Sequence, residues 1–152
     1  MSDHINRLLT DFGNALGLEG LALDESGYCC LSFDEVVLNI ESMGESSLAL
    51  LYTRLGVLPE DASSEICRRL LAANHFFKDT ALATIGLDEA SRNVDMTRVL
   101  ETAGMEVLDW EAAIKAFVDA AESCAKLLQA SADSADASQP LALAERSYLI
   151  RG

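Results

Sequence analysis

Few side chains in this chain of 152 residues could perform nucleophilic or metal chemistry. They are His4, His75, Cys29, Cys30, Cys67 and Cys124. His75 could act as a base beside Cys67, but a spacing of eight residues places them only loosely on one helix face, so an interface or partly buried histidine is the preferred interpretation. The cysteines show no C-x-x-C spacing, and two histidines without cysteine pairs cannot assemble an ordinary zinc site. We therefore expect small buried thiols and no disulfides.

Pairs of adjacent acidic residues are the other candidates for chemistry. They are Asp24-Glu25, Asp34-Glu35, Glu60-Asp61 and Asp88-Glu89. Each pair falls at an expected turn or helix start, where acids are favoured for local hydrogen bonding. The sequence also lacks a calcium loop, a G-x-G-x-x-G motif and a P-loop lysine. It therefore predicts no enzyme, no metal and no cofactor; the alternative is a small enzymatic or ligand-binding domain with a pocket between sheet and helices.

The charge distribution is strongly acidic. The chain has 11 basic and 25 acidic side chains, a formal net charge of −14, and no Lys or Arg between Arg7 and Arg54. Such a surface repels phosphate, so we expect no nucleic-acid partner and no anionic membrane surface as a partner. The sequence has neither the roughly 18 consecutive apolar residues of a membrane span nor the opening of a signal peptide, so we expect a cytoplasmic protein.

The hydrophobic periodicity predicts one α+β domain over residues 1–130. The expected elements are a helix over 3–17, strands over 29–33, 36–41 and 47–57, a helix from Pro59 to about Lys78, strands over 81–87 and 94–101, and a long helix capped by Asp109. This order, α-β-β-β-α-β-β-α, fits a twisted antiparallel sheet. Residues 131–152 are too polar at first to pack and predict a flexible C-terminal tail, whose apolar end over 141–150 either frays or docks on the domain or a neighbour.

More apolar surface is predicted than one copy of the domain can cover. The strand segment Leu48–Tyr52 is apolar at even and odd positions, and the first and second helices carry wide apolar stripes. Apolar surface of this kind, in an acidic domain without catalytic groups, indicates a dimer that holds a polypeptide.

Five segments resemble the class I type III secretion chaperones of the CesT/SycE-like family. They are residues 23–35, 50–61, 70–77, 85–88 and 107–111, and together they cover roughly residues 3–130 in the family's order of elements. The family consists of small acidic cytoplasmic proteins of Gram-negative bacteria that each escort one or a few effectors. The chain departs from the family at His75, where an apolar residue is usual, and in the length of its tail.

The resemblance implies a homodimer and an effector partner. The dimer interface would be built by the second helix and the fourth strand, from Ile66, Leu70, Leu71, Ala73, Asn74, Leu82, Thr84 and Ile85. An extended segment near the effector's N-terminus would wrap around the dimer and stay non-globular, soluble and secretion-competent. Its contacts would be Leu9, Phe12, Leu16, Leu31, Phe33, Val37 and Leu51.

Two further partners stay open at this point. The secretion ATPase or export apparatus is an additional candidate partner. The alternative function is a regulatory adaptor of the same fold, which sequesters another secretion-system protein, such as an anti-activator, in place of an exported effector.

Overall fold

The computed structural model describes residues 2–61, 64–132 and 148–150. The elements are α1 (Ser2–Ala15), β1 (Tyr28–Phe33), β2 (Val36–Ser42), β3 (Leu48–Val57), α2 (Ser64–Asn74), a 3₁₀ turn (His75–Phe77), β4 (Thr84–Leu87), β5 (Asn93–Glu101), α3 (Val107–Ala132) and β6 (Tyr148–Ile150). Through α3 this order is the predicted α-β-β-β-α-β-β-α arrangement, so the predicted fold class is confirmed.

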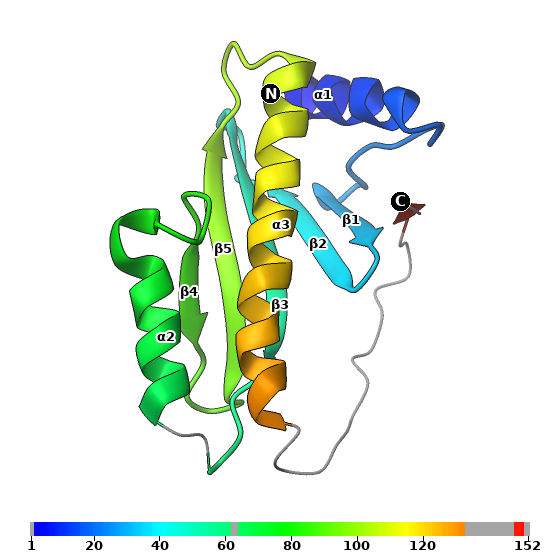
Figure 1. The fold of residues 1–152 in the computed structure, drawn as a ribbon. Helices are drawn as coiled ribbons and strands as arrows, with labels where there is room; N and C mark the ends of the chain where they lie inside the picture. The colour runs from blue at the N-terminus through cyan, green and yellow to red at the C-terminus, as the bar shows by residue number, and fades with distance from the viewer. Residues whose placement is uncertain (1, 62–63, 133–147, 151–152) are drawn as a thin grey trace.

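The strands form one sheet in the order β4-β5-β3-β2-β1-β6 (Figure 1). The first five strands of this series are antiparallel, and β6 alone runs parallel to its neighbour β1. β6 falls within the predicted tail, whose residues 133–147 and 151–152 lie outside the described residues. The sheet therefore has an additional edge strand that the sequence pattern did not predict.

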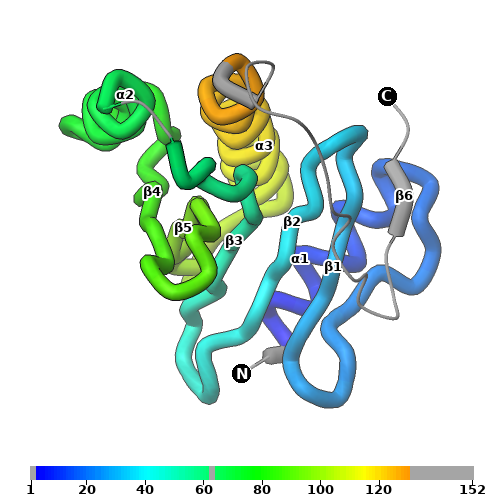
Figure 2. The backbone as a smooth tube through the Cα atoms, turned by 90° about the horizontal axis from the view of Figure 1, so that it is seen from below, coloured from blue at the N-terminus to red at the C-terminus, as the bar shows by residue number. Residues whose placement is uncertain are grey.

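One face of the sheet carries the core. α2 and α3 lie over this face, and α1 packs against α3 near the end of β1 (Figures 1 and 2). Burial alternates along β2 and β3, because every second side chain points to the same side of a strand, whereas the residues of β1 from Cys29 to Ser32 are all buried. The largest fully buried side chains include Trp110 and Phe117 from α3, Ile5 and Leu9 from α1, and Leu51 from β3.

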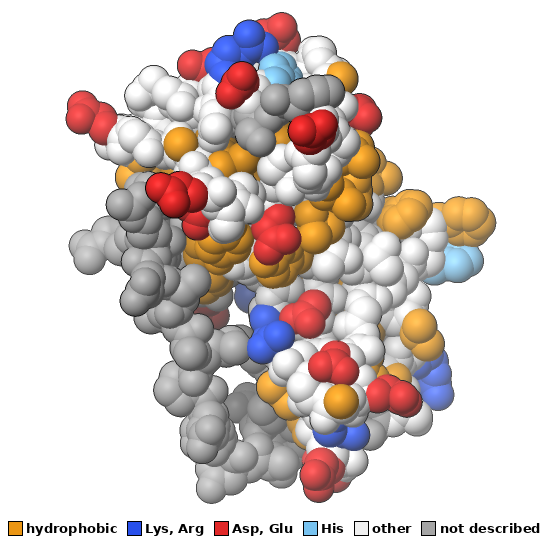
Figure 3. Space-filling model, turned by 180° about the vertical axis from the view of Figure 1, so that it is seen from behind, with side chains coloured by type: hydrophobic (Ala, Val, Ile, Leu, Met, Phe, Trp, Pro, Cys, Tyr) orange, Lys and Arg blue, Asp and Glu red, His pale blue; other side chains and the backbone are white. Residues whose placement is uncertain are grey.

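The opposite face of the sheet has its own apolar area, which we call the outer-face patch: Val37, Leu50, Tyr52 and Val99. The register pairs Leu50 with Val99, and these residues are exposed or half-buried. Figure 3 shows hydrophobic side chains gathered across this side of the molecule with acidic groups around them. The prediction that β3 is apolar on both faces is therefore confirmed by its packing.

Several element boundaries differ from the sequence prediction. α2 begins at Ser64 and not at Pro59, because the chain over 59–61 is coil and turn. It ends at Asn74 and not near Lys78, because Phe76 and Phe77 adopt left-handed backbone angles, with φ of 53° and 56°. The strand β4 begins at Thr84, after a loop in which Leu82 is also left-handed. Asp109 lies inside the first turn of α3, where a carboxylate still complements the helix dipole, and does not cap it.

Candidate functional site

An apolar groove lies between α1, the end of β1 and the middle of α3. Its apolar lining comes from Phe12, Leu16, Phe33, Ile114 and Val118, and the hollow measures about 260 Å³. Leu16 is 40% exposed, whereas Phe12 forms the floor and is 3% exposed. The groove therefore offers a hydrophobic surface that a side chain from another molecule can reach.

Local structure fixes the position of both ends of the groove. The amide of Leu16 donates to the carbonyl oxygens of Phe12 and Gly13 at 3.2 and 3.0 Å, which extends the last turn of α1 by one residue. Phe33 ends β1 directly before a tight turn, in which Asp34 takes a left-handed φ of 48°. Asp is among the residues that tolerate this conformation in a hairpin turn.

Charged side chains surround the groove and are mostly acidic. Asp34, Glu111, Asp119 and Glu122 line it together with a single cation, Lys115. The Lys115 ammonium donates to the Asp119 carboxylate at 2.6 Å, and this hydrogen bond raises the pKa of Lys115. Because its one lysine is already paired, the groove presents a net negative rim, which favours a ligand that carries basic side chains.

The structure separates the predicted effector-binding residues into three groups. Phe12, Leu16 and Phe33 line the groove together. Leu9, Leu31 and Leu51 are fully buried in the core, so in this structure they support the groove and have no exposed surface. Val37 is 37% exposed but belongs to the outer-face patch.

Two groove residues on α3, Ile114 and Val118, were missed by the sequence prediction. Both belong to the apolar stripe of a long helix, and that spacing is typical of core residues. Ile114 and Val118 are four residues apart and so lie one helical turn apart on the side of α3 that faces α1. This spacing is the sequence signal that could have identified them. The position of α1 on α3 is a tertiary feature, so periodicity alone does not reveal it.

A second apolar hollow, of about 240 Å³, lies between α2 and β4. It is lined mainly by Leu58, Cys67, Leu70, Leu71, Ile85, Leu87 and Val94. Leu71, which lines it, is 69% exposed, and in the segment that connects α2 to β4 Phe76 is 87% exposed and Leu82 is 63% exposed. We call these exposed residues and the hollow the α2–β4 face.

All of the residues predicted for the dimer interface belong to α2, β4 or the loop between them. Leu70, Leu71, Asn74 and Ile85 line the hollow, and Leu82 and Thr84 are exposed near it. Ile66 and Ala73 are buried against the rest of the subunit. The α2–β4 face thus brings together most of the predicted set.

Asn74 connects the two elements of this face. Its side-chain amide donates to the carbonyl oxygen of Ile85 at 3.0 Å, and its Oδ1 accepts from the amide of Ile85 at 2.8 Å. The amide group therefore pairs with β4 as a neighbouring strand would. Its polar atoms are used within the subunit, which leaves the contacts of the face to its apolar neighbours.

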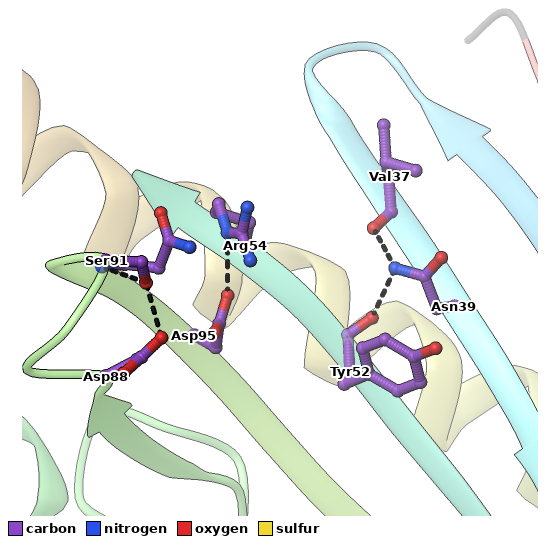
Figure 4. A network of polar contacts seen from close by, with 8 residues as sticks. Val37, Asn39, Tyr52, Arg54, Asp88, Ser91 and Asp95 are labelled. Atoms are coloured by element: carbon purple, nitrogen blue, oxygen red, sulfur yellow. Dashed lines mark hydrogen bonds and ion pairs between the residues drawn. The ribbon is translucent and has the colours of Figure 1, made fainter. Parts of the chain in front are cut away.

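Polar side chains tie the strands together on the outer face of the sheet (Figure 4). Asn39 Nδ2 donates to the carbonyl oxygen of Tyr52 at 3.2 Å, and the Tyr52 hydroxyl donates to Glu41 at 2.7 Å. Burial, followed by the hydrogen bond to Glu41, raises the pKa of Tyr52. The hydroxyl therefore stays neutral, and the network stabilises the sheet around the outer-face patch.

The buried thiols are unsuited to nucleophilic work. Burial raises the pKa of Cys29 to about 12, and burial also raises the pKa of Cys124. Within residues 2–61, 64–132 and 148–150 no three His, Cys, Asp or Glu side chains come close enough to hold a metal ion. Over the same residues, no helix is both long and apolar enough to span a bilayer.

The architecture defines the class of protein. The five antiparallel strands β4-β5-β3-β2-β1, with two helices over one face and a third at the end of β1, have the fold of the type III secretion chaperones. The chain belongs to the Tir chaperone protein (CesT) family, whose family model matches residues 7–125.

Individual relatives agree with this assignment. The chain is 30% identical over 135 residues to the transcriptional anti-antiactivator ExsC of Pseudomonas aeruginosa strain PAO1, covering 88% of this chain and 91% of ExsC. It is similar to the crystal structure of the ExsC–ExsE complex, with a TM-score of 0.69 and 29% identity over 84% of this chain and 96% of the other. The HopA1–SchA chaperone–effector complex shares the fold at a TM-score of 0.66 and 20% identity, over 81% and 94% of the two chains.

Proposed function

We propose that this protein is a cytoplasmic type III secretion chaperone that works as a homodimer and binds an extended segment near the N-terminus of one or a few secreted effectors. The observation that carries the proposal is the apolar groove in a member of the CesT family, in which Leu16 and Phe33 keep accessible surface beside the buried Phe12, Ile114 and Val118. The client segment would stay non-globular while bound and would remain ready for export.

Binding by the groove requires no chemical step. An unstructured segment that orders on binding loses roughly 2–5 kcal/mol of its gross interaction energy. A long contact through apolar side chains and backbone hydrogen bonds has to supply more than this amount. Leu16 and Phe33 contribute only part of such a contact, because full burial of a large apolar side chain contributes about 1.5–3 kcal/mol and both are already partly buried.

Charge determines which segments fit best. The acidic rim around the groove and the net charge of −14 attract a segment that carries Lys or Arg between its apolar residues. We expect its binding to weaken as salt is raised, because screening acts on exposed charges. The same charge keeps the loaded complex soluble.

The α2–β4 face supports the homodimer. Leu71, Phe76 and Leu82 are largely exposed beside an apolar hollow, and monomeric proteins rarely leave such a patch uncovered. In a two-fold interface the same face of each subunit meets its counterpart, so each exposed residue is buried twice. Contact with the secretion ATPase or export apparatus would then use other surfaces.

A regulatory adaptor is the second candidate function. The sequence relative at 30% identity is named a transcriptional anti-antiactivator, which favours a partner within a regulatory circuit. The adaptor would use the same groove and dimer. It differs in its partner, which would be a regulator that stays in the cell and not an exported protein.

The test begins with the tagged full-length protein purified from its own host, followed by identification of bound proteins by mass spectrometry. The affinity of the binding segment is then measured by calorimetry for the natural protein and for the variants Leu16→Asp and Met43→Asp. Met43 is a matched control because it is 43% exposed, as against 40% for Leu16, and does not line the groove.

We expect Leu16→Asp to lower the affinity at least about tenfold, which corresponds to 1.4 kcal/mol, and Met43→Asp to leave it unchanged. An equal loss in both variants would show that the groove is not the binding surface. A bound protein that is exported supports the chaperone, whereas a bound regulator that is not exported supports the adaptor.

A further inference from the structure

The C-terminal strand β6 pairs with β1 on the side away from β2 and so forms the last strand of the sheet. β6 runs parallel to β1, with Leu31 opposite Tyr148, Ser32 opposite Leu149 and Phe33 opposite Ile150. Without β6, β1 would be the edge of the sheet and would present a row of unpaired amides and carbonyls. Such a row is the ordinary site at which an extended peptide adds a strand to a sheet.

This edge adjoins the groove described above. Phe33 pairs with Ile150 through its backbone, and the same residue lines the groove. An extended segment that fills the groove is therefore next to the backbone groups that β6 uses. A client that added a strand to β1 would need those groups for itself.

The pairing of β6 with β1 is weak enough for another strand to replace β6. It involves only three residues, and parallel pairs are slightly less stable per residue than antiparallel ones. The strand belongs to the same chain, however, and tethering gives it an effective concentration in about the millimolar range. A weak strand therefore stays bound in the free protein and is replaced by a longer one.

We propose that β6 acts as an internal competitor that covers the strand-accepting edge of β1 until a client segment displaces it. The proposal rests on the proposed function only in its last step, the displacement by a client. If β6 is bound nine-tenths of the time, the apparent dissociation constant of the client is raised about tenfold. The surface thus accepts an extended segment that pairs with Leu31–Phe33.

The variant that tests the pairing is the full-length chain with Leu149→Pro and Ile150→Pro together. In a parallel pair every second residue of a strand donates its N–H to a given neighbour. Proline has no N–H, so of two successive prolines one always replaces a residue that donates to β1. The matched control is Gly152→Pro, which lies beyond the paired residues. Circular dichroism checks that both variants keep the folded domain.

Two measurements without any client address the occupancy of the edge. Hydrogen exchange at those amides of residues 31–33 that point toward β6 should accelerate at least about fivefold in the double variant and remain slow in the control, whereas the amides that point toward β2 should stay slow in both. A synthetic peptide of residues 147–152, added at millimolar concentration, should shift the nuclear magnetic resonance signals of these amides in the double variant and much less in the natural protein. Unchanged exchange, or equal shifts in both proteins, would overturn the proposal.

A third measurement addresses competition. The double variant should bind the client segment at least about threefold more tightly than the natural protein, and equal affinities would also overturn the proposal. Failure of the proposed function looks different, because then no segment binds in a way that depends on Leu16, while the exchange and peptide measurements still report on β6.

Discussion

Leu71→Asp is the sharpest test of the dimer. Leu71 lies on the solvent side of α2 at the rim of the α2–β4 hollow and is 69% exposed. The substitution therefore leaves the fold of one subunit nearly unaffected. In a two-fold dimer through this face it introduces two buried carboxylates, one from each subunit.

The expected loss of dimer stability follows from the fraction of the Leu71 side chain that is exposed in one subunit. Full burial of a leucine contributes about 1.5–3 kcal/mol, so burying the exposed 69% of Leu71 contributes about 1–2 kcal/mol, and the two copies about 2–4 kcal/mol. Loss of that burial alone raises the dimer dissociation constant about 30- to 700-fold. Desolvation of two unpaired carboxylates adds several kcal/mol, so the variant should be monomeric at micromolar concentration.

Sedimentation velocity over a hundredfold range of concentration measures the effect. The control is Leu108→Asp, because Leu108 is 74% exposed on the first turn of α3 and lines neither the groove nor the α2–β4 hollow. The thermal midpoint of each variant, measured by circular dichroism, reports the fold. A Leu71→Asp protein that sediments as the natural dimer would refute the assignment of this face.

Two further predictions concern a thiol and a carboxylate. Cys67 is half-buried in the α2–β4 hollow, so its alkylation by iodoacetamide should slow as the protein concentration is raised and the dimer forms. Burial raises the pKa of Cys29 to about 12, so Cys29 should react only after unfolding. A rate for Cys67 that does not depend on concentration would contradict a dimer through this face. The Glu101 carboxylate accepts hydrogen bonds from the hydroxyl of Ser47 and the amide of Ala103, which lower its pKa. The resulting stabilisation is present at neutral pH and is lost as the pH falls below the ordinary pKa of glutamate, near about 4.3. The free energy of urea unfolding of Glu101→Gln should therefore depend less on pH between 5 and 3 than that of the natural protein. An equal dependence on pH in both proteins would disprove the role of this carboxylate.

The elements could be predicted from the sequence because one-sided burial imposes a period on the chain. Alternation along β2 and β3 and the helical spacing of Ile5 and Leu9 follow directly from packing against one layer. The division between core and groove could not be predicted in this way. Leu9 and Phe12 occupy the same stripe of α1, and only the position of α3 leaves one in the core and the other at the groove.

Other features depend on interactions that leave no periodic pattern. The left-handed backbone at Phe76 and Phe77 ends α2 early, although neither residue type favours that conformation. β6 has three residues, which is too short for any alternation to be recognised. Its pairing depends on the edge of β1, which exists only once the sheet has formed.

The amide of Asn74, which pairs with the backbone of Ile85, has a consequence for kinetics. In the proposed homodimer, α2 and β4 would therefore be held in one arrangement before two subunits meet, and no internal adjustment would be needed first. Association of the subunits should then proceed at the rate of rigid docking, about 10⁵–10⁷ M⁻¹s⁻¹, so that differences in dimer stability between variants should appear mainly in the dissociation rate.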